Sequence, residues 1–148
     1  MKFTSIFFFI SACLLQAESQ TVLPSNIPTA VIDEFEKKFP DAGNIRWTQE
    51  MPGFLEAEFL GAKGLMNVTY STTGTWFETD YNIKRDSLPA ACTEYISTNF
   101  PESKIFHSGV SESSIHGLRY EVDIRSDGKK WELTFDATGK FIMKGQAE

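Results

Sequence analysis

Apolar and polar positions follow two different periods along the chain, and the change between them separates helices from strands. In residues 27–40 apolar side chains recur every four positions, which predicts one face of an amphipathic helix. Residues 88–101 repeat that spacing. In both segments an early proline, Pro28 or Pro89, suits the first helical turn, and a later proline suits the end of the helix. The apolar positions are Val31, Phe35 and Phe39 in the first segment and Cys92, Ile96 and Phe100 in the second.

After each helix the period falls to two, which is typical of half-buried strands. Short turns rich in glycine separate these strands, so neighbours are expected to pair antiparallel and to bury one face only. The expected strands lie at about 44–50, 54–60, 65–71 and 75–81, then at about 104–110, 118–125, 130–136 and 140–144. The residues expected to face the helices are Leu55, Ala57, Phe59, Met66, Val68, Tyr70, Tyr120, Val122, Ile124, Trp131, Leu133 and Phe135.

The two sets of elements form an internal repeat. The helical segments align at an offset of 61 residues, from Pro28 to Pro89, and the last hairpins at an offset of 65, from Tyr70 to Phe135. The four extra residues are placed in 111–117, where they predict a longer hairpin loop. The fold class is therefore α+β, a tandem repeat of one helix plus a four-stranded antiparallel meander, with copies at 20–84 and 85–148 in one structural domain.

Several short motifs also carry a family resemblance. The stretches "LPAA…YISTNFP", "NIRW", "FLEAEF", "YEVDI" and "LTFDATGKF" resemble the PepSY-like proteins of bacterial envelopes, which are described as similar in fold to the β-lactamase inhibitory protein. The resemblance implies that the strands of both copies join into one curved sheet with the helices on one face. It also implies protein binding, or restraint of a secreted enzyme, and it supplies no catalytic residues.

The first residues have the form of an export signal. Lys2 precedes an apolar run from Phe3 to Leu15, which is shorter than the roughly 20 residues that span a bilayer. We therefore interpret residues 1–19 as a signal peptide. Two outcomes are open: cleavage after Ala17 or Ser19 releases a periplasmic or secreted protein, or Cys13 in "ISAC" is a lipidated first residue that anchors the protein to the envelope.

Composition narrows the classes of function. With 41% hydrophobic residues the chain can fill a core, which excludes disorder. A net charge of −6 without a basic stripe argues against a nucleic-acid partner. No catalytic set of residues is evident, so we expect no enzyme, no cofactor and no metal site. His107 and His116 lack the spacing of metal ligands, and Cys92 falls on a core position, where small core filler is favoured over a reactive thiol.

The open face of the expected sheet is the candidate site. Four acids alternate with core residues and so point away from the helices, and two aromatic residues are candidate apolar anchors. This face could hold a protein or peptide partner by charge, or it could be solvated surface that resists aggregation. The favoured function is a non-catalytic exported binding module, whose partner could be an enzyme that it inhibits; the alternative is a small-ligand or Ca²⁺-binding envelope sensor. The candidate residues are Glu56, Glu58, Glu121, Asp123, Phe77 and Tyr81.

Overall fold

The computed structural model describes residues 20–49 and 51–147, and these form one antiparallel sheet whose strand order equals the chain order. The predicted signal peptide, including Cys13, lies outside the described residues. Helices α1 (Thr29–Lys38) and α2 (Ala90–Asn99) each follow a short 3-10 turn. The strands are β1 (Gln20–Val22), β2 (Gly43–Gln49), β3 (Phe54–Gly61), β4 (Gly64–Ser71), β5 (Trp76–Asn82), β6 (Lys104–Ser113), β7 (Gly117–Ser126), β8 (Lys129–Asp136) and β9 (Phe141–Gln146).

Both predicted helices are confirmed. The prolines stand one residue outside the helices, with extended backbone at Pro28 and Pro89, so each restricts the entry to a helix and is not part of its first turn. At the other end, the N–H of Phe39 donates to the carbonyl of Phe35 at 2.8 Å. In each helix one capping residue, Phe39 or Phe100, therefore separates the last helical residue from the proline that follows in the chain.

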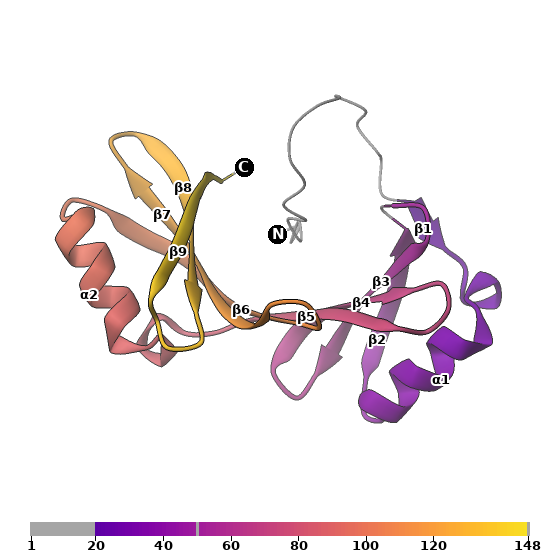
Figure 1. Ribbon diagram of the computed structural model, residues 1–148. Helices are drawn as coiled ribbons and strands as arrows, with labels where there is room; N and C mark the ends of the chain where they lie inside the picture. The colour runs from indigo at the N-terminus through magenta and orange to yellow at the C-terminus, as the bar shows by residue number, and fades with distance from the viewer. Residues whose placement is uncertain (1–19, 50, 148) are drawn as a thin grey trace.

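Both helices lie on the same face of the sheet. Val68 pairs with Thr79, Tyr81 pairs with Val110, and Val110 pairs with Tyr120, so one face can be followed from β4 to β7. Figure 1 shows α1 and α2 at opposite ends of the bent sheet, on its outer side, with β5 and β6 in the middle. Within the described part of the chain neither helix covers the opposite face, which we call the open face.

The helix-bearing face holds two hydrophobic cores. Apolar residues predicted to face the helices are confirmed there, and Phe59, Val68, Leu133 and Phe135 are fully buried. The core of the first half consists of Ile27, Val31, Phe35, Trp47, Leu55, Ala57, Phe59, Met66, Val68 and Tyr70. The core of the second half consists of Leu88, Cys92, Ile96, Val122, Ile124, Leu133 and Phe135, with Tyr120 and Trp131 partly buried against it.

The extra residues of the second half lengthen strands. The prediction of a longer loop at 111–117 is wrong, because β6 and β7 have 10 residues each and only residues 114–116 connect them. Ser111 and Ser113 instead pair with Asp80 and Glu78 of β5. The added length therefore builds the ladder between β5 and β6 that joins the two halves.

The two similar hairpins bring a glycine against the start of each helix. Gly74 has φ +87° and Gly139 has φ +84°, a backbone region that glycine adopts without strain. A Cβ on Gly74 would lie 2.7 Å from the carbonyl oxygen of Ala30, and one on Gly139 would lie 3.0 Å from the Cβ of Ala91. Both hairpins thus use glycine to let a helix pack closely on the sheet.

Candidate functional site

The open face carries acidic side chains in register across both halves of the molecule. Glu56 on β3 pairs with Thr69, which pairs with Glu78 on β5. In the second half, Asp123 on β7 lies opposite Glu132 on β8. All four acids predicted for this face, Glu56, Glu58, Glu121 and Asp123, lie on it.

The acids of the first half are partly neutralised. Arg46 on β2 is paired in register with Glu58, and its Nη2 lies 3.0 Å from the carboxylate Oε1. The Arg46 side chain is more than half exposed, so water screens this ion pair and its contribution to stability is small. Glu56, two residues before Glu58 on the same strand, is half-buried.

The acids of the second half influence one another's ionisation. Burial raises the pKa of Glu121 to about 7, and the carboxylates of Glu132, Glu78 and Asp123 act in the same direction, while His107 opposes them. Burial also raises the pKa of Glu132, with Asp123 adding to the effect. The carboxylates on this part of the open face therefore repel one another when they are ionised.

His107 on β6 contacts both the first half of the molecule and an acid of the second half. Nε2 of His107 lies 2.5 Å from Oδ1 of Asn82 on β5, and Nδ1 lies 3.4 Å from Oδ2 of Asp123. Beside it, the hydroxyl of Ser111 donates a hydrogen bond to the carboxylate of Glu78. Polar contacts thus cross the ladder between β5 and β6 on the open face.

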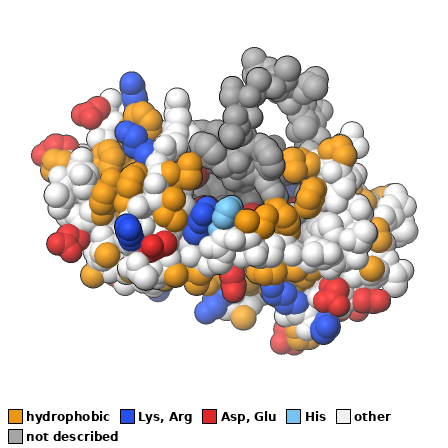
Figure 2. Space-filling model, in the orientation of Figure 1, with side chains coloured by type: hydrophobic (Ala, Val, Ile, Leu, Met, Phe, Trp, Pro, Cys, Tyr) orange, Lys and Arg blue, Asp and Glu red, His pale blue; other side chains and the backbone are white. Residues whose placement is uncertain are grey.

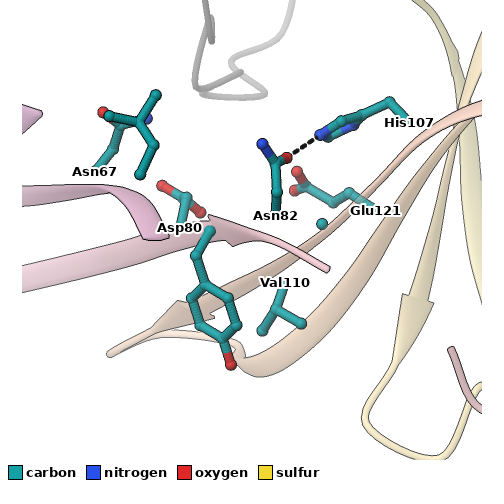
Figure 3. Close-up of a pocket in the computed structure, with 9 residues that line it drawn as sticks. Asn67, Asp80, Asn82, His107, Val110 and Glu121 are labelled. Carbon is teal, nitrogen blue, oxygen red and sulfur yellow. Dashed lines mark hydrogen bonds between the residues drawn. The ribbon is translucent and has the colours of Figure 1, made fainter. Parts of the chain in front are cut away.

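A small hollow lies at the ladder between β5 and β6, where the two halves of the molecule meet; we call this place the joint. Its volume is about 30 Å³. In Figure 3 the side chains of Asn82, His107 and Glu121 lie toward one another above the strands, while Val110 points to the other side. Asn67 is only 4% exposed, and its Oδ1 has no hydrogen-bond partner among the residues that the structure describes. The residues that line the hollow are Leu65, Asn67, Asp80, Tyr81, Asn82, His107, Gly109, Val110 and Glu121.

The two aromatic candidates lie on different faces. Phe77 is half-buried and packs edge-on against Phe54, with ring centroids 5.3 Å apart, and Phe54 shares the open face with Glu56. Tyr81 pairs with Met66 and Val110 on the helix-bearing face. The prediction that Tyr81 lies beside the acids on the open face is therefore wrong. Tyr81 is nevertheless one of the residues that line the hollow.

Sequence reasoning missed the polar residues of the joint. Asp80, Asn82 and Asn67 received no role, because nothing in the sequence shows that β5 and β6 are neighbours. The available signal was Gly109, a lone glycine inside a strand, which often marks close approach of another group. A Cβ at Gly109 would lie 3.3 Å from Cε1 of His107.

Other kinds of site receive little support from the described residues. Across 20–49 and 51–147, no three His, Cys, Asp or Glu side chains are grouped as a metal site requires. Neither described helix has the length and apolar character to cross a membrane. In Figure 2 acidic and basic side chains are scattered over the visible surface, and hydrophobic side chains gather over the part where β7, β8 and β9 lie.

The sequence matches one protein family. The profile described as "Putative beta-lactamase-inhibitor-like, PepSY-like" matches residues 54–143, which is more than half of the chain. The chain belongs to this PepSY-like family. Among curated proteins, none matches the chain.

Solved structures share the fold. A BLIP-like protein of Bacteroides fragilis has a TM-score of 0.73 at 21% identity, covering 85% of this chain and 89% of its own. A DUF2874 family protein of Bacteroides uniformis has a TM-score of 0.73 at 16% identity, covering 80% and 88%. A "putative periplasmic" protein of Bacteroides eggerthii has a TM-score of 0.72 at 16% identity, covering 80% and 88%. At these identities the likeness concerns the fold alone.

Proposed function

We propose that this PepSY-like protein is a non-catalytic exported binding module that holds a protein or peptide partner on the open face. The observation that carries the proposal is the position of the acids: Glu56, Glu58, Glu121 and Asp123 share one face, while both helices lie on the other. A sheet face of this extent suits a broad surface contact. Its negative charge favours a partner with basic side chains.

The size of the hollow favours a protein partner over a small ligand. Its volume of about 30 Å³ is far below the roughly 300–1,000 Å³ of sites that enclose drug-sized ligands. The family description names a β-lactamase-inhibitor-like character, which supports restraint of an enzyme as one form of this binding. Phe77, packed on Phe54 beside the acids, would supply an apolar contact.

We also propose that the two halves, 20–84 and 85–148, are copies of one unit within a single structural domain. The order of one helix followed by four strands occurs twice. The β-bulge before Arg46 on β2 has a counterpart before His107 on β6, 61 residues later. The pairing of β5 with β6 supports the proposal that the halves belong to one domain.

Export is the third part of the proposal. Residues 1–19 would act as the signal, and the protein would be periplasmic, secreted or anchored through Cys13. The intact mass of the protein recovered from the envelope distinguishes these outcomes. A mass that lacks about 17 to 19 residues indicates release, one that starts at a lipid-modified Cys13 indicates anchoring, and an unprocessed mass contradicts export through this signal.

Paired affinity capture from envelope extract tests the binding face. The open-face variant carries Glu56→Lys, Glu58→Lys and Asp123→Lys. The control variant carries Glu36→Lys, Glu94→Lys and Glu102→Lys, whose side chains are exposed and lie outside the open face. Both variants change the net charge equally, so non-specific charge effects cancel between them. Thermal unfolding confirms that all three baits are folded.

We expect the wild type and the control variant to retain the same protein and the open-face variant to lose it. That protein is then the partner, and an assay of its own activity shows whether it is restrained. If all three baits retain the same proteins, the open face is not the binding surface and the proposal fails.

A further inference from the structure

Two exposed leucines lie side by side on the open face of the first half. Leu60 on β3 pairs in register with Leu65 on β4, and the two residues are 46% and 36% exposed. Only residues 62–63 separate β3 from β4, so the leucines lie near the tip of this hairpin. Neighbouring exposed apolar side chains, unlike scattered ones, point to a surface that contacts a partner.

The fold does not require leucine at these two positions. The hairpin of β7 and β8 has the same register 65 residues later, and there Arg125 pairs with Lys130. The second half therefore forms an equivalent antiparallel hairpin with two basic residues where the first half has Leu60 and Leu65. The leucines are thus available for a role other than folding.

A buried acceptor lies directly beside the leucines. Asn67 follows Leu65 by two residues on β4, so their side chains share the open face. Asn67 is 4% exposed and lines the hollow, and no described residue donates a hydrogen bond to its Oδ1. Figure 3 shows its side chain on the opposite side of the strands from Val110. A buried carbonyl oxygen without a donor is unfavourable, so a ligand that supplies one N–H gains free energy there.

This acceptor favours a neutral donor over a cation. The carboxylates that flank Asn67 in register are those of Glu58 and Asp80, and each already has an interaction, Glu58 with Arg46. An ammonium or guanidinium over the two leucines would lose much of its hydration and gain one neutral acceptor, which is unfavourable. A largely apolar side chain with a single N–H loses far less hydration.

The indole of tryptophan has the required chemistry. Its ring is a large apolar surface, and its Nε1–H donates a hydrogen bond but cannot accept one. A tyrosine hydroxyl would bring oxygen lone pairs beside the carboxylates of Glu58 and Asp80, and phenylalanine has no donor. Tryptophan is also one of the side chains that contribute most to binding at protein interfaces.

We propose that Leu60, Leu65 and Asn67 form a site that receives a tryptophan side chain of the partner protein. The two leucines contact the ring, and Nε1–H donates to Oδ1 of Asn67. The acids elsewhere on the open face act at longer range, through the charge of the partner. This inference rests on the proposed function, because it names the side chain by which a partner is held on the open face.

Four probes test the ring and its N–H separately. They are the Nα-acetyl N-methylamides of tryptophan, tyrosine, lysine and benzothienylalanine, in which a sulfur atom replaces the indole N–H. Binding to the folded protein at pH 7 is followed by NMR through the backbone amides of residues 59–68. The tryptophan and benzothienylalanine probes have nearly the same shape, so the difference in their affinities measures the hydrogen bond.

Three variants separate the contacts. Asn67→Leu removes the acceptor and keeps the size of the side chain. Leu60→Arg with Leu65→Lys introduces the pair that the second half has at the equivalent positions, so the hairpin should still fold. Ile115→Arg with Ile142→Lys is the matched control, because these isoleucines are 65% and 40% exposed and lie outside the site. Thermal unfolding confirms that each variant is folded.

The tryptophan probe should shift these amides and bind about tenfold more tightly than each of the other probes. Asn67→Leu should reduce its preference over benzothienylalanine to less than about twofold, because the acceptor is gone. The double leucine variant should lose binding, and the control should keep it. Equal wild-type binding of tryptophan and benzothienylalanine, tighter binding of tyrosine or lysine, or no shift at millimolar probe overturns the inference.

Affinity capture keeps this result apart from the proposed function. If capture of the partner depends on the acids of the open face while the wild type shows no preference for tryptophan, only this inference fails. If capture never depends on the open face, the proposed function fails, whatever the probes show.

Discussion

Nε2 of His107 lies 2.5 Å from Oδ1 of Asn82, so a ring from the second half of the molecule bonds the last residue of β5 in the first half. Nδ1 of the same ring lies 3.4 Å from the Asp123 carboxylate on β7. One side chain thus connects three adjacent strands across the joint. This position gives His107 a part in holding the halves together.

Replacing His107 by phenylalanine should lower the free energy of unfolding by about 1 kcal/mol, because the ring volume is kept while the bond to Asn82 is lost. His116 lies exposed in the loop between β6 and β7, so His116→Phe is the control and should change stability by less than about 0.5 kcal/mol. Urea denaturation at pH 7 measures both. Equal effects of the two substitutions would contradict a role for His107 at the joint.

The stability of the protein should fall between pH 5 and pH 8 because of Glu121. The folded protein binds the Glu121 proton more tightly than the unfolded chain, since burial raises the folded-state pKa from 4.5 to about 7. The stabilising contribution of this proton is complete below about pH 4.5 and is lost as the pH rises through about 7. Glu132, whose pKa is also raised, acts in the same direction.

Glu121→Gln should therefore raise the free energy of unfolding by about 1–3 kcal/mol at pH 8, and this gain should shrink toward pH 5. Urea denaturation of both proteins at several pH values gives the difference. The ¹³C shift of the Glu121 carboxyl carbon reports its titration directly. A midpoint near 4.5 in the folded protein would contradict the prediction.

The hairpin glycines Gly74 and Gly139 should tolerate alanine poorly. Each has a positive φ, and each would bring a Cβ against the start of a helix. We expect Gly74→Ala and Gly139→Ala each to cost about 2–4 kcal/mol of stability. Gly53 has φ +88°, and no described residue lies within 4 Å of its added Cβ, so Gly53→Ala should cost only about 1–2 kcal/mol.

Thermal or urea unfolding of the three variants separates backbone strain from the helix contact. The excess loss at Gly74 and Gly139 over Gly53 measures the contact with α1 and α2. Equal losses at all three positions would show that the helices do not depend on these glycines for their close approach.

Cys92 should resist alkylation in the folded protein. Its side chain is fully buried, and burial raises the pKa of the thiol to about 11, so the reactive thiolate is scarce at pH 8. Iodoacetamide should modify the peptide that contains Cys92 only after the protein is unfolded in urea. Mass spectrometry of that peptide follows the reaction. Rapid modification of the native protein would support the alternative of a reactive thiol.

Periodicity predicted most of the architecture because each half buries one regular stripe. The spacing of Val31, Phe35 and Phe39 marked α1, and the alternation along β3 and β4 marked the two faces. β1 was missed because three residues are too few to show an alternating pattern. The added residues at 111–113 were assigned to a loop because the sequence does not show that β5 pairs with β6.

A β-bulge explains the misplacement of Tyr81. Trp76 faces the helices, so strict alternation along β5 would put Phe77, Thr79 and Tyr81 on the open face. One extra residue at Phe77 shifts the pairing register between Thr69 and Tyr70. Every later residue of β5 therefore lies on the opposite face from the one that strict alternation predicts. A bulge leaves no clear signal in a single sequence, and the hollow bordered by Asp80 and Asn82 could not be foreseen for the same reason.

The agreement between strand order and chain order also bears on how the protein folds. From β1 to β9 every ladder joins strands that are neighbours in sequence, and the longest interruption is the segment with α2 between β5 and β6. Low sequence separation of contacts reduces the loop-closure entropy of folding and is associated with fast folding. A chain that emerges from a ribosome or a translocation channel N-terminus first can add each new strand to an edge that already exists, without waiting for its C-terminus.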